Sequence, residues 1–122
     1  MSDDKGVTLK DVERLLGVSL PTSYSALLQA ARAQTKKSFL LFYALDRVLS
    51  LNEKYQVGKF APGAFVVGSD GGGEALVLDV RPDSPTNGQF YFMPFIPLGW
   101  KEAVLAGTTL EEIMDSYNTR WG

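Results

Sequence analysis

The sequence predicts an α+β fold, with helices packed on a mainly antiparallel sheet. Before residue 60 most apolar residues recur at the spacing of amphipathic helices. From about residue 64 they form short apolar or alternating runs separated by turn residues, and helical spacing returns at residue 109. Because the later runs are joined by links of hairpin length, neighbouring strands should run antiparallel. We expect N-terminal helices, a sheet of four or more strands and a C-terminal helix, in a single domain over residues 1–122.

Three segments in the first half carry helical spacing. The first, residues 8–16, should end at Gly17, because glycine readily adopts the left-handed conformation that follows many helices. A second helix should begin at Pro21, which suits a first helical turn. Residues 32–38 are predicted to be a polar connection, and residues 45–57 return to helical spacing.

Four short apolar segments are predicted to be strands. They comprise residues 39–43, 64–68, 74–80 and 89–93. Alternation in the third places two sets of side chains on opposite faces of the sheet: Leu76, Leu78 and Val80 on one, Ala75, Val77 and Asp79 on the other. In the fourth, Phe90 and Phe92 oppose Tyr91 and Met93. One of these pairs should belong to the core, and the other either forms an aromatic binding surface or is covered as well.

Prolines separate the last strand from the C-terminal helix. Proline donates no backbone hydrogen bond, so the segment PFIPLGW should leave the sheet and lead into a short helical turn around Trp100, Ala103 and Val104. Thr109 and Glu112 then have the spacing of a capping box, which marks the start of the last helix.

Composition excludes several classes of function. The 122 residues contain no histidine and no cysteine, which removes histidine-based triads, cysteine nucleophiles, disulfides and typical zinc sites. A net charge of −2 without a basic cluster is unlike a nucleic-acid binder. We expect no signal peptide in the polar N-terminus, and no apolar run is long enough to span a membrane. We expect a cytoplasmic protein without a cofactor, since the lack of cysteine fits that compartment.

One glycine-rich segment has the composition of a ligand loop: Gly68, Ser69, Asp70, Gly71, Gly72, Gly73 and Glu74. It lacks the lysine of a phosphate-binding loop, and a strand follows where a dinucleotide site needs a helix. It also lacks the alternating oxygen ligands of a calcium loop and the glycine spacing of a nucleophile elbow. We expect a hairpin turn in which Asp70 accepts backbone N–H bonds and the glycines supply positive φ.

Carboxylate chemistry is the alternative that this region leaves open. Asp70, Glu74 and Asp79 could form an acid–base pair or hold a magnesium ion, as in a small hydrolase. However, Glu74 and Asp79 are five residues apart, so a continuous strand would direct them to opposite faces. We therefore expect no catalytic and no metal site here.

Several motifs occur together in a characteristic order. They are VERLLGVSLPTSYSALL, FYAL, NEKY, APGAFVVGSDGGGEALVLDVR, MPFIPL and TLEEIM. In this order they resemble the SUKH superfamily, a domain shared by a fungal cell-wall assembly regulator and many bacterial immunity proteins. The resemblance covers roughly residues 8–117. Its most specific parts are Leu16-Gly17, Leu20-Pro21 and Tyr24, and the Gly68-to-Glu74 loop followed by Asp79.

The resemblance implies an α+β fold without catalysis and a protein as the partner. Bacterial members resemble cytoplasmic antitoxins that bind and block the toxin domains of polymorphic secretion systems. The leading expectation is therefore a non-enzymatic immunity protein that binds a toxin domain, but no nucleic acid, membrane or small-molecule substrate. The alternative is a cytoplasmic scaffold or regulatory domain of the cell-wall regulator type.

A partner-binding surface should be built from exposed aromatic and acidic residues, because interface energy concentrates in a few such side chains. The aromatic candidates are Tyr91, Trp100 and Trp121. Asp83 and Glu102 are the acidic candidates for the rim.

Overall fold

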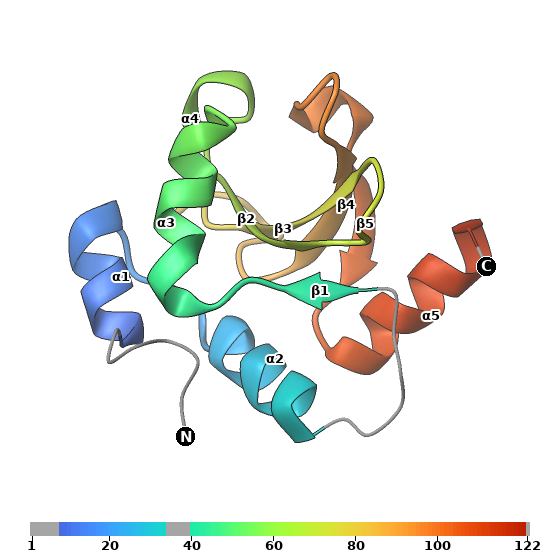
Figure 1. Cartoon of the computed structure of the whole chain (residues 1–122), viewed down its shortest axis with the longest axis horizontal. Coiled ribbons are helices and arrows are strands. Elements are labelled where there is room, and N and C mark those ends of the chain that lie inside the picture. Colours follow the sequence, from blue (N-terminus) through green and yellow to red (C-terminus); the bar gives the residue numbers. More distant parts are fainter. Residues whose placement is uncertain (1–7, 34–39, 122) are drawn as a thin grey trace.

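A computed structural model of the chain describes residues 8–33 and 40–121. Helices and strands occur along these residues in an order that matches the predicted α+β class (Figure 1). The elements are α1 (Leu9–Leu16), α2 (Thr22–Ala33), β1 (Leu41–Phe42), α3 (Leu45–Lys54), α4 (Val57–Phe60), β2 (Ala64–Ser69), β3 (Glu74–Asp79), β4 (Phe90–Pro94), the 3-10 helix η1 (Trp100–Glu102), β5 (Val104–Gly107) and α5 (Leu110–Trp121).

The sheet has five strands in the order β1-β2-β3-β4-β5, and every neighbouring pair is antiparallel. This confirms the predicted hairpin connections. Ala64 at the start of β2 pairs with Asp79 at the end of β3, and Glu74 pairs with Pro94 of β4. The sequence did not predict β5, because its four residues carry little alternation. Val104, expected in the helical turn around Trp100, instead begins this strand, and Pro94, expected to leave the sheet, ends β4.

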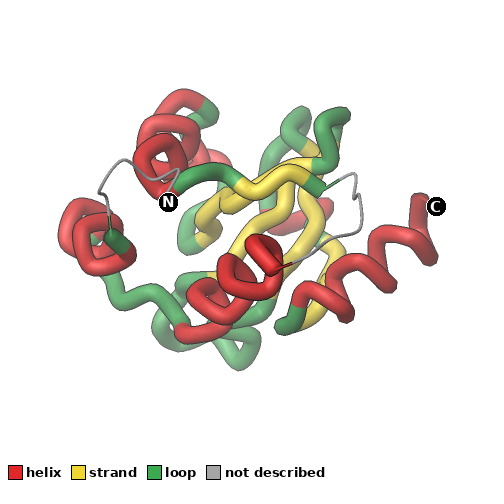
Figure 2. The backbone as a smooth tube through the Cα atoms, turned by 60° about the horizontal axis from the view of Figure 1, so that its bottom comes forward, coloured by secondary structure: helices red, strands yellow, loops and turns green. Residues whose placement is uncertain are grey.

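The main core lies between one face of the sheet and the helices α1, α2, α3 and α5. Figure 2 shows α2 lying across the front of the sheet. Strand residues of this face include Leu76, Leu78, Phe90 and Phe92, all buried, as the predicted alternation requires. Ile113 of α5 is buried in the same cluster.

The opposite face of the sheet is also covered, by α4 and by the segment between β4 and β5. Val57 of α4 packs with Val77 and Met93 of this face. Tyr91 is partly buried here and Met93 fully buried. Of the two arrangements left open for this face, the structure has the one in which both faces are covered.

The segment predicted as one helix over residues 45–57 forms two helices. Helix α3 ends at Lys54, and Gln56 adopts a left-handed conformation with φ 53°. Helix α4 then starts at Val57 in a new direction, which brings Val57 onto the second face of the sheet. Of the predicted strand over residues 39–43, Leu41 and Phe42 form β1, and residue 39 lies outside the described residues. Of the predicted polar connection over residues 32–38, Arg32 and Ala33 belong to α2 and the rest lies outside the described residues.

At two positions in the sheet, side chains of helices form hydrogen bonds with backbone groups of strands. Beside the short β1, the side chain of Asn52 in α3 pairs with both backbone groups of Val66 in β2. Its Nδ2 donates to the Val66 carbonyl and its Oδ1 accepts from the Val66 N–H, both at 2.8 Å. This contact lies at the irregular register between Val66 and Gly68. On β5, the Ser116 hydroxyl of α5 donates to the Ala106 carbonyl at 2.9 Å.

The glycine-rich segment forms the hairpin turn between β2 and β3. Asp70 Oδ1 accepts the N–H groups of Gly72 at 2.8 Å and Glu74 at 3.2 Å. Its other oxygen accepts the Tyr117 hydroxyl of α5 at 3.2 Å, which links the turn to the last helix. Of the three consecutive glycines only Gly71 is left-handed, with φ 79°, so the expected positive φ applies to that residue alone.

We expect Gly71→Ala to lower the free energy of unfolding by about 1–2 kcal/mol, because a left-handed conformation is costly for a residue with a Cβ. Gly73→Ala is the matched control, since its φ is not left-handed and no heavy atom lies within 4 Å of its Cβ position. Urea unfolding of both variants checks this. Equal losses would show that the turn does not depend on the left-handed residue.

Candidate functional site

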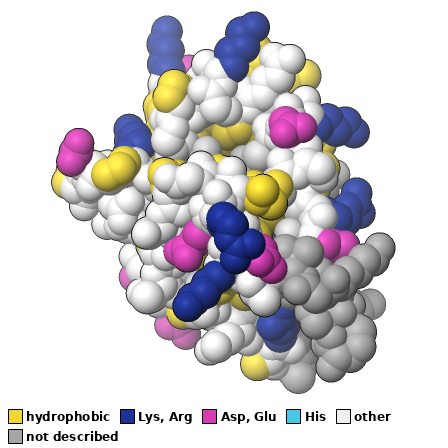
Figure 3. Space-filling view, turned by 90° about the vertical axis from the view of Figure 1, so that its left-hand side faces the viewer, with side chains coloured by type: hydrophobic (Ala, Val, Ile, Leu, Met, Phe, Trp, Pro, Cys, Tyr) yellow, Lys and Arg dark blue, Asp and Glu magenta, His cyan; other side chains and the backbone are white. Residues whose placement is uncertain are grey.

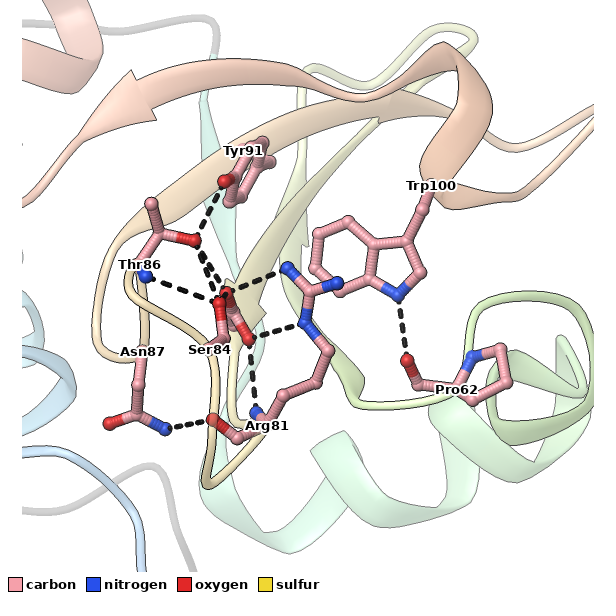
Figure 4. Close-up of polar contacts among 8 residues, drawn as sticks. Pro62, Arg81, Ser84, Thr86, Asn87, Tyr91 and Trp100 are labelled. Carbon is pink, nitrogen blue, oxygen red and sulfur yellow. Dashed lines mark hydrogen bonds and ion pairs between the residues drawn. The ribbon is translucent and has the colours of Figure 1, made fainter.

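A buried carboxylate organises the end of β3. Asp79 is fully buried, and five donors surround its two oxygens. They belong to Arg81, Ser84 and Thr86, which are labelled in Figure 4. Oδ1 accepts from the Arg81 backbone N–H and from Arg81 Nε, both at 3.0 Å. Oδ2 accepts from Arg81 Nη2 at 2.9 Å and from the hydroxyls of Ser84 and Thr86, each at 2.7 Å. The carboxylate thus fixes both Arg81 and the loop between β3 and β4.

The charge of this carboxylate is stabilised in place. Burial alone would raise the pKa of Asp79, but the hydrogen bonds from Arg81, Ser84 and Thr86 outweigh it and hold the pKa far below its ordinary value. The same contact with Asp79 raises the pKa of Arg81. A carboxylate with so low a pKa is a poor general acid or base near neutral pH.

Arg81 connects this network to Trp100. Its guanidinium carbon lies 3.8 Å from the centre of the Trp100 ring, a cation–π contact. The Tyr91 ring meets Trp100 edge-on at 5.2 Å, and the Tyr91 hydroxyl is 2.8 Å from that of Thr86. Trp100 Nε1 donates to the Pro62 carbonyl at 2.6 Å. We call the partly exposed side chains of Arg81 and Trp100 the Arg81–Trp100 surface.

A glycine makes room for this arrangement. Gly63 has φ 82°, and a Cβ at this position would lie 2.0 Å from Cγ of Arg81. The Gly63 carbonyl also accepts the Val80 N–H at 2.9 Å, which joins the two segments. The glycine of the APG sequence therefore allows the Arg81 side chain to cross the backbone toward Trp100.

An apolar groove begins beside Arg81. One part, of about 500 Å³, lies between the end of α1, helix α4 and the strand ends at Phe65 and Val80. A second part of about 430 Å³ shares Leu16, Asn52 and Gly58 with the first and continues along α3. Figure 3 views this side and shows hydrophobic side chains in and around a central hollow, with lysine and arginine side chains projecting around it.

The structure brings together some of the predicted partner-binding residues. Tyr91 and Trp100 are in contact, and Glu102 is exposed in η1, the same short helix as Trp100. Asp83 is exposed in the loop between β3 and β4. Trp121 ends α5, and its side chain lies outside the described part of the structure.

The three acids considered for catalysis do not converge. Glu74 and Asp79 begin and end β3, and at about 3.3 Å per residue they are on the order of 16 Å apart along the strand. Asp70 belongs to the turn at the Glu74 end. Among residues 8–33 and 40–121, no three side chains of the metal-binding types are grouped around a possible ion.

Sequence reasoning missed Arg81, the residue that joins the buried network to the aromatic surface. A signal was present: residues two apart on an extended chain share a face, so Asp79 and Arg81 were placed to pair. Ser84 and Thr86 follow in the turn-rich segment between the predicted strands of residues 74–80 and 89–93.

The helices and the five-stranded antiparallel sheet form an α+β domain. A model of the SMI1 / KNR4 family (SUKH-1) matches residues 6–116, which include the glycine-rich turn, the Asp79 network and Trp100. The chain belongs to this family. No match was found among curated proteins. Within the described part of the chain, no helix is long and apolar enough to cross a membrane.

We expect Asp79→Asn to lower the free energy of unfolding by about 2–4 kcal/mol at pH 7, because it leaves Arg81 without its charged partner and replaces an acceptor with a donor. Asp83→Asn, an exposed acid in the same loop, is the control and should change it by less than about 0.5 kcal/mol. Urea unfolding of both variants measures the two effects.

The pH dependence of the Asp79 effect follows from the lowered pKa. A carboxyl whose pKa is lower in the folded state stabilises the fold above its unfolded pKa, about 3.9, and loses that effect as pH falls toward the folded value. The difference in free energy of unfolding between wild type and Asp79→Asn should therefore be largest above about pH 5 and should shrink below about pH 4. A difference that stays constant down to pH 3 would contradict the ionised network.

Proposed function

We propose that this chain is a non-enzymatic protein-binding domain that acts in the cytoplasm as an immunity protein, blocking a cognate toxin domain. Membership of the SMI1 / KNR4 family (SUKH-1) supports a protein as the partner. The best-supported contact region is the Arg81–Trp100 surface, together with the apolar groove that starts beside Arg81.

The observation that carries this proposal is the way Trp100 is held. Its ring is fixed by Arg81, by Tyr91 and by the hydrogen bond to Pro62. An aromatic side chain that is ordered before binding loses little conformational entropy when a partner arrives. Tryptophan and arginine are also the residue types in which binding energy most often concentrates.

The chemistry of the site supports binding rather than catalysis. Asp79, whose pKa is strongly lowered, is fully buried, and its oxygens accept hydrogen bonds from Arg81, Ser84 and Thr86. Asp70 accepts bonds that form the glycine turn. The partly exposed groups at the site are instead a guanidinium, aromatic rings and aliphatic side chains, which suit a protein surface.

We expect co-expression of this chain with the toxin domain encoded next to its own gene to restore growth and to give a complex that co-purifies. Trp100→Ala should weaken that complex by at least about 30-fold, the loss of about 2 kcal/mol or more that defines an interface hot spot. Leu41→Ala is the matched control, since Leu41 is 55% exposed on the edge strand β1, away from η1. Calorimetric titration measures both affinities.

Two other outcomes decide between functions. If the pair neither co-purifies nor restores growth, the immunity function is wrong and a scaffold or regulatory domain takes its place. If growth is restored without a stable complex, and Asp70→Asn or Glu74→Gln abolishes the rescue, the chain is an enzyme.

A further inference from the structure

Apolar side chains are exposed at the end of the molecule that carries α4 and η1. Tyr55 is 36% exposed, Phe60 51% and Ile96 92%, and Pro97 is exposed beside Ile96. We call these four residues the apolar tip. Exposed apolar residues that gather at one place, unlike single ones, mark interaction sites.

Two segments distant in sequence form this tip. The Tyr55 ring lies 4.9 Å from the ring of Phe95, the residue before Ile96. The backbone of Gly99 passes Phe60, because a Cβ on Gly99 would lie 3.5 Å from the Phe60 carbonyl oxygen. In Figure 1 both segments lie at the top, α4 on one side and η1 on the other.

Three exposed lysines belong to the segments that form the tip. Lys54, Lys59 and Lys101 are exposed, and none forms an ion pair with the described residues. The Lys59 ammonium lies 5.4 Å from the centre of the Phe60 ring, and that of Lys54 lies 6.0 Å from the Tyr55 ring. Charge and apolar surface are thus available to the same partner.

We infer that the apolar tip binds an acidic segment of the partner protein, one that inserts an apolar side chain between carboxylates. This inference rests on the proposed function and names the chemistry of the partner. The carboxylates would meet Lys54, Lys59 and Lys101, while the apolar side chain would cover Phe60 and Ile96. The tip adjoins the Arg81–Trp100 surface through Gly99, so one partner can contact both.

A protein partner fits this surface better than an anionic membrane. Glu53 and Glu102 are exposed beside Lys54 and Lys101. A lipid surface presents negative charge everywhere and would be repelled by both glutamates. A folded partner can place carboxylates beside the lysines and avoid the glutamates, which is how charge patterns confer specificity.

A peptide titration tests this chemistry without the toxin. The probes are a synthetic peptide with a central Leu-Phe pair between pairs of glutamates, and the same peptide with lysines in their place. In NMR spectra of the full chain, the acidic peptide should shift amide signals in residues 53–60 and 95–102 and bind at least about tenfold more tightly than the basic one. Equal affinities, or shifts confined to other residues, would overturn the inference.

Variants make the peptide test specific. The triple variant Lys54→Glu, Lys59→Glu, Lys101→Glu should reverse the preference between the two peptides, and Ile96→Ser should weaken both. Lys10→Glu, an exposed reversal on α1, is the control and should leave the preference unchanged. Binding to phosphatidylserine–phosphatidylcholine vesicles that is as tight as binding to the acidic peptide would assign the tip to a membrane instead.

The toxin complex separates this inference from the proposed function. In that complex the triple variant should slow association by at least about tenfold at low salt, because charge reversal removes electrostatic steering. If the toxin binds this variant and Ile96→Ser as it binds wild type, the inference is wrong and the proposed function stands. If no toxin binds the wild type, the proposed function fails and the peptide titration alone decides the inference.

Discussion

The buried charge of Asp79 is the constraint on which the best-defined surface of this protein depends. A carboxylate without water around it needs donors on every side, and here they come from Arg81 and from the loop that follows β3. The hydrogen bonds to the carboxylate fix the position of the Arg81 guanidinium, and the guanidinium in turn packs on the ring of Trp100. An electrostatic requirement inside the domain therefore determines the shape of an aromatic surface outside it.

Much of the fold could be predicted from local sequence. Gly17 and the Thr109–Glu112 pair mark helix ends through backbone chemistry that involves only neighbouring residues, and the structure confirms both. The split after α3 could not be predicted, because Gln56 is left-handed only where α4 must turn onto the sheet. Strand β5 was missed because its four residues carry little alternation, so that only its pairing with β4 marks it as a strand.

The candidate site was less predictable, since exposure depends on packing rather than residue type. Tyr91 and Trp100 were identified as aromatic candidates, but their contact with each other required the register of β4 and the position of η1. Arg81 was missed although Asp79 was singled out. Their spacing places both on one face, but the need of Asp79 for a charged partner arises from its burial, which depends on packing. The apolar tip joins segments distant in sequence through the contact of Tyr55 with Phe95, and the exposure of Phe60 and Ile96 cannot be read from the sequence.

Asn52 and Ser116 occupy backbone groups of the sheet that another chain would otherwise pair with. Open strand edges invite strand addition, which recognises main chain and is therefore tolerant of sequence. With Val66 and Ala106 already bonded, a partner at these positions has to recognise side chains instead. Substitution of surface residues can therefore change what binds at these positions, while the backbone hydrogen bonds of the sheet stay the same.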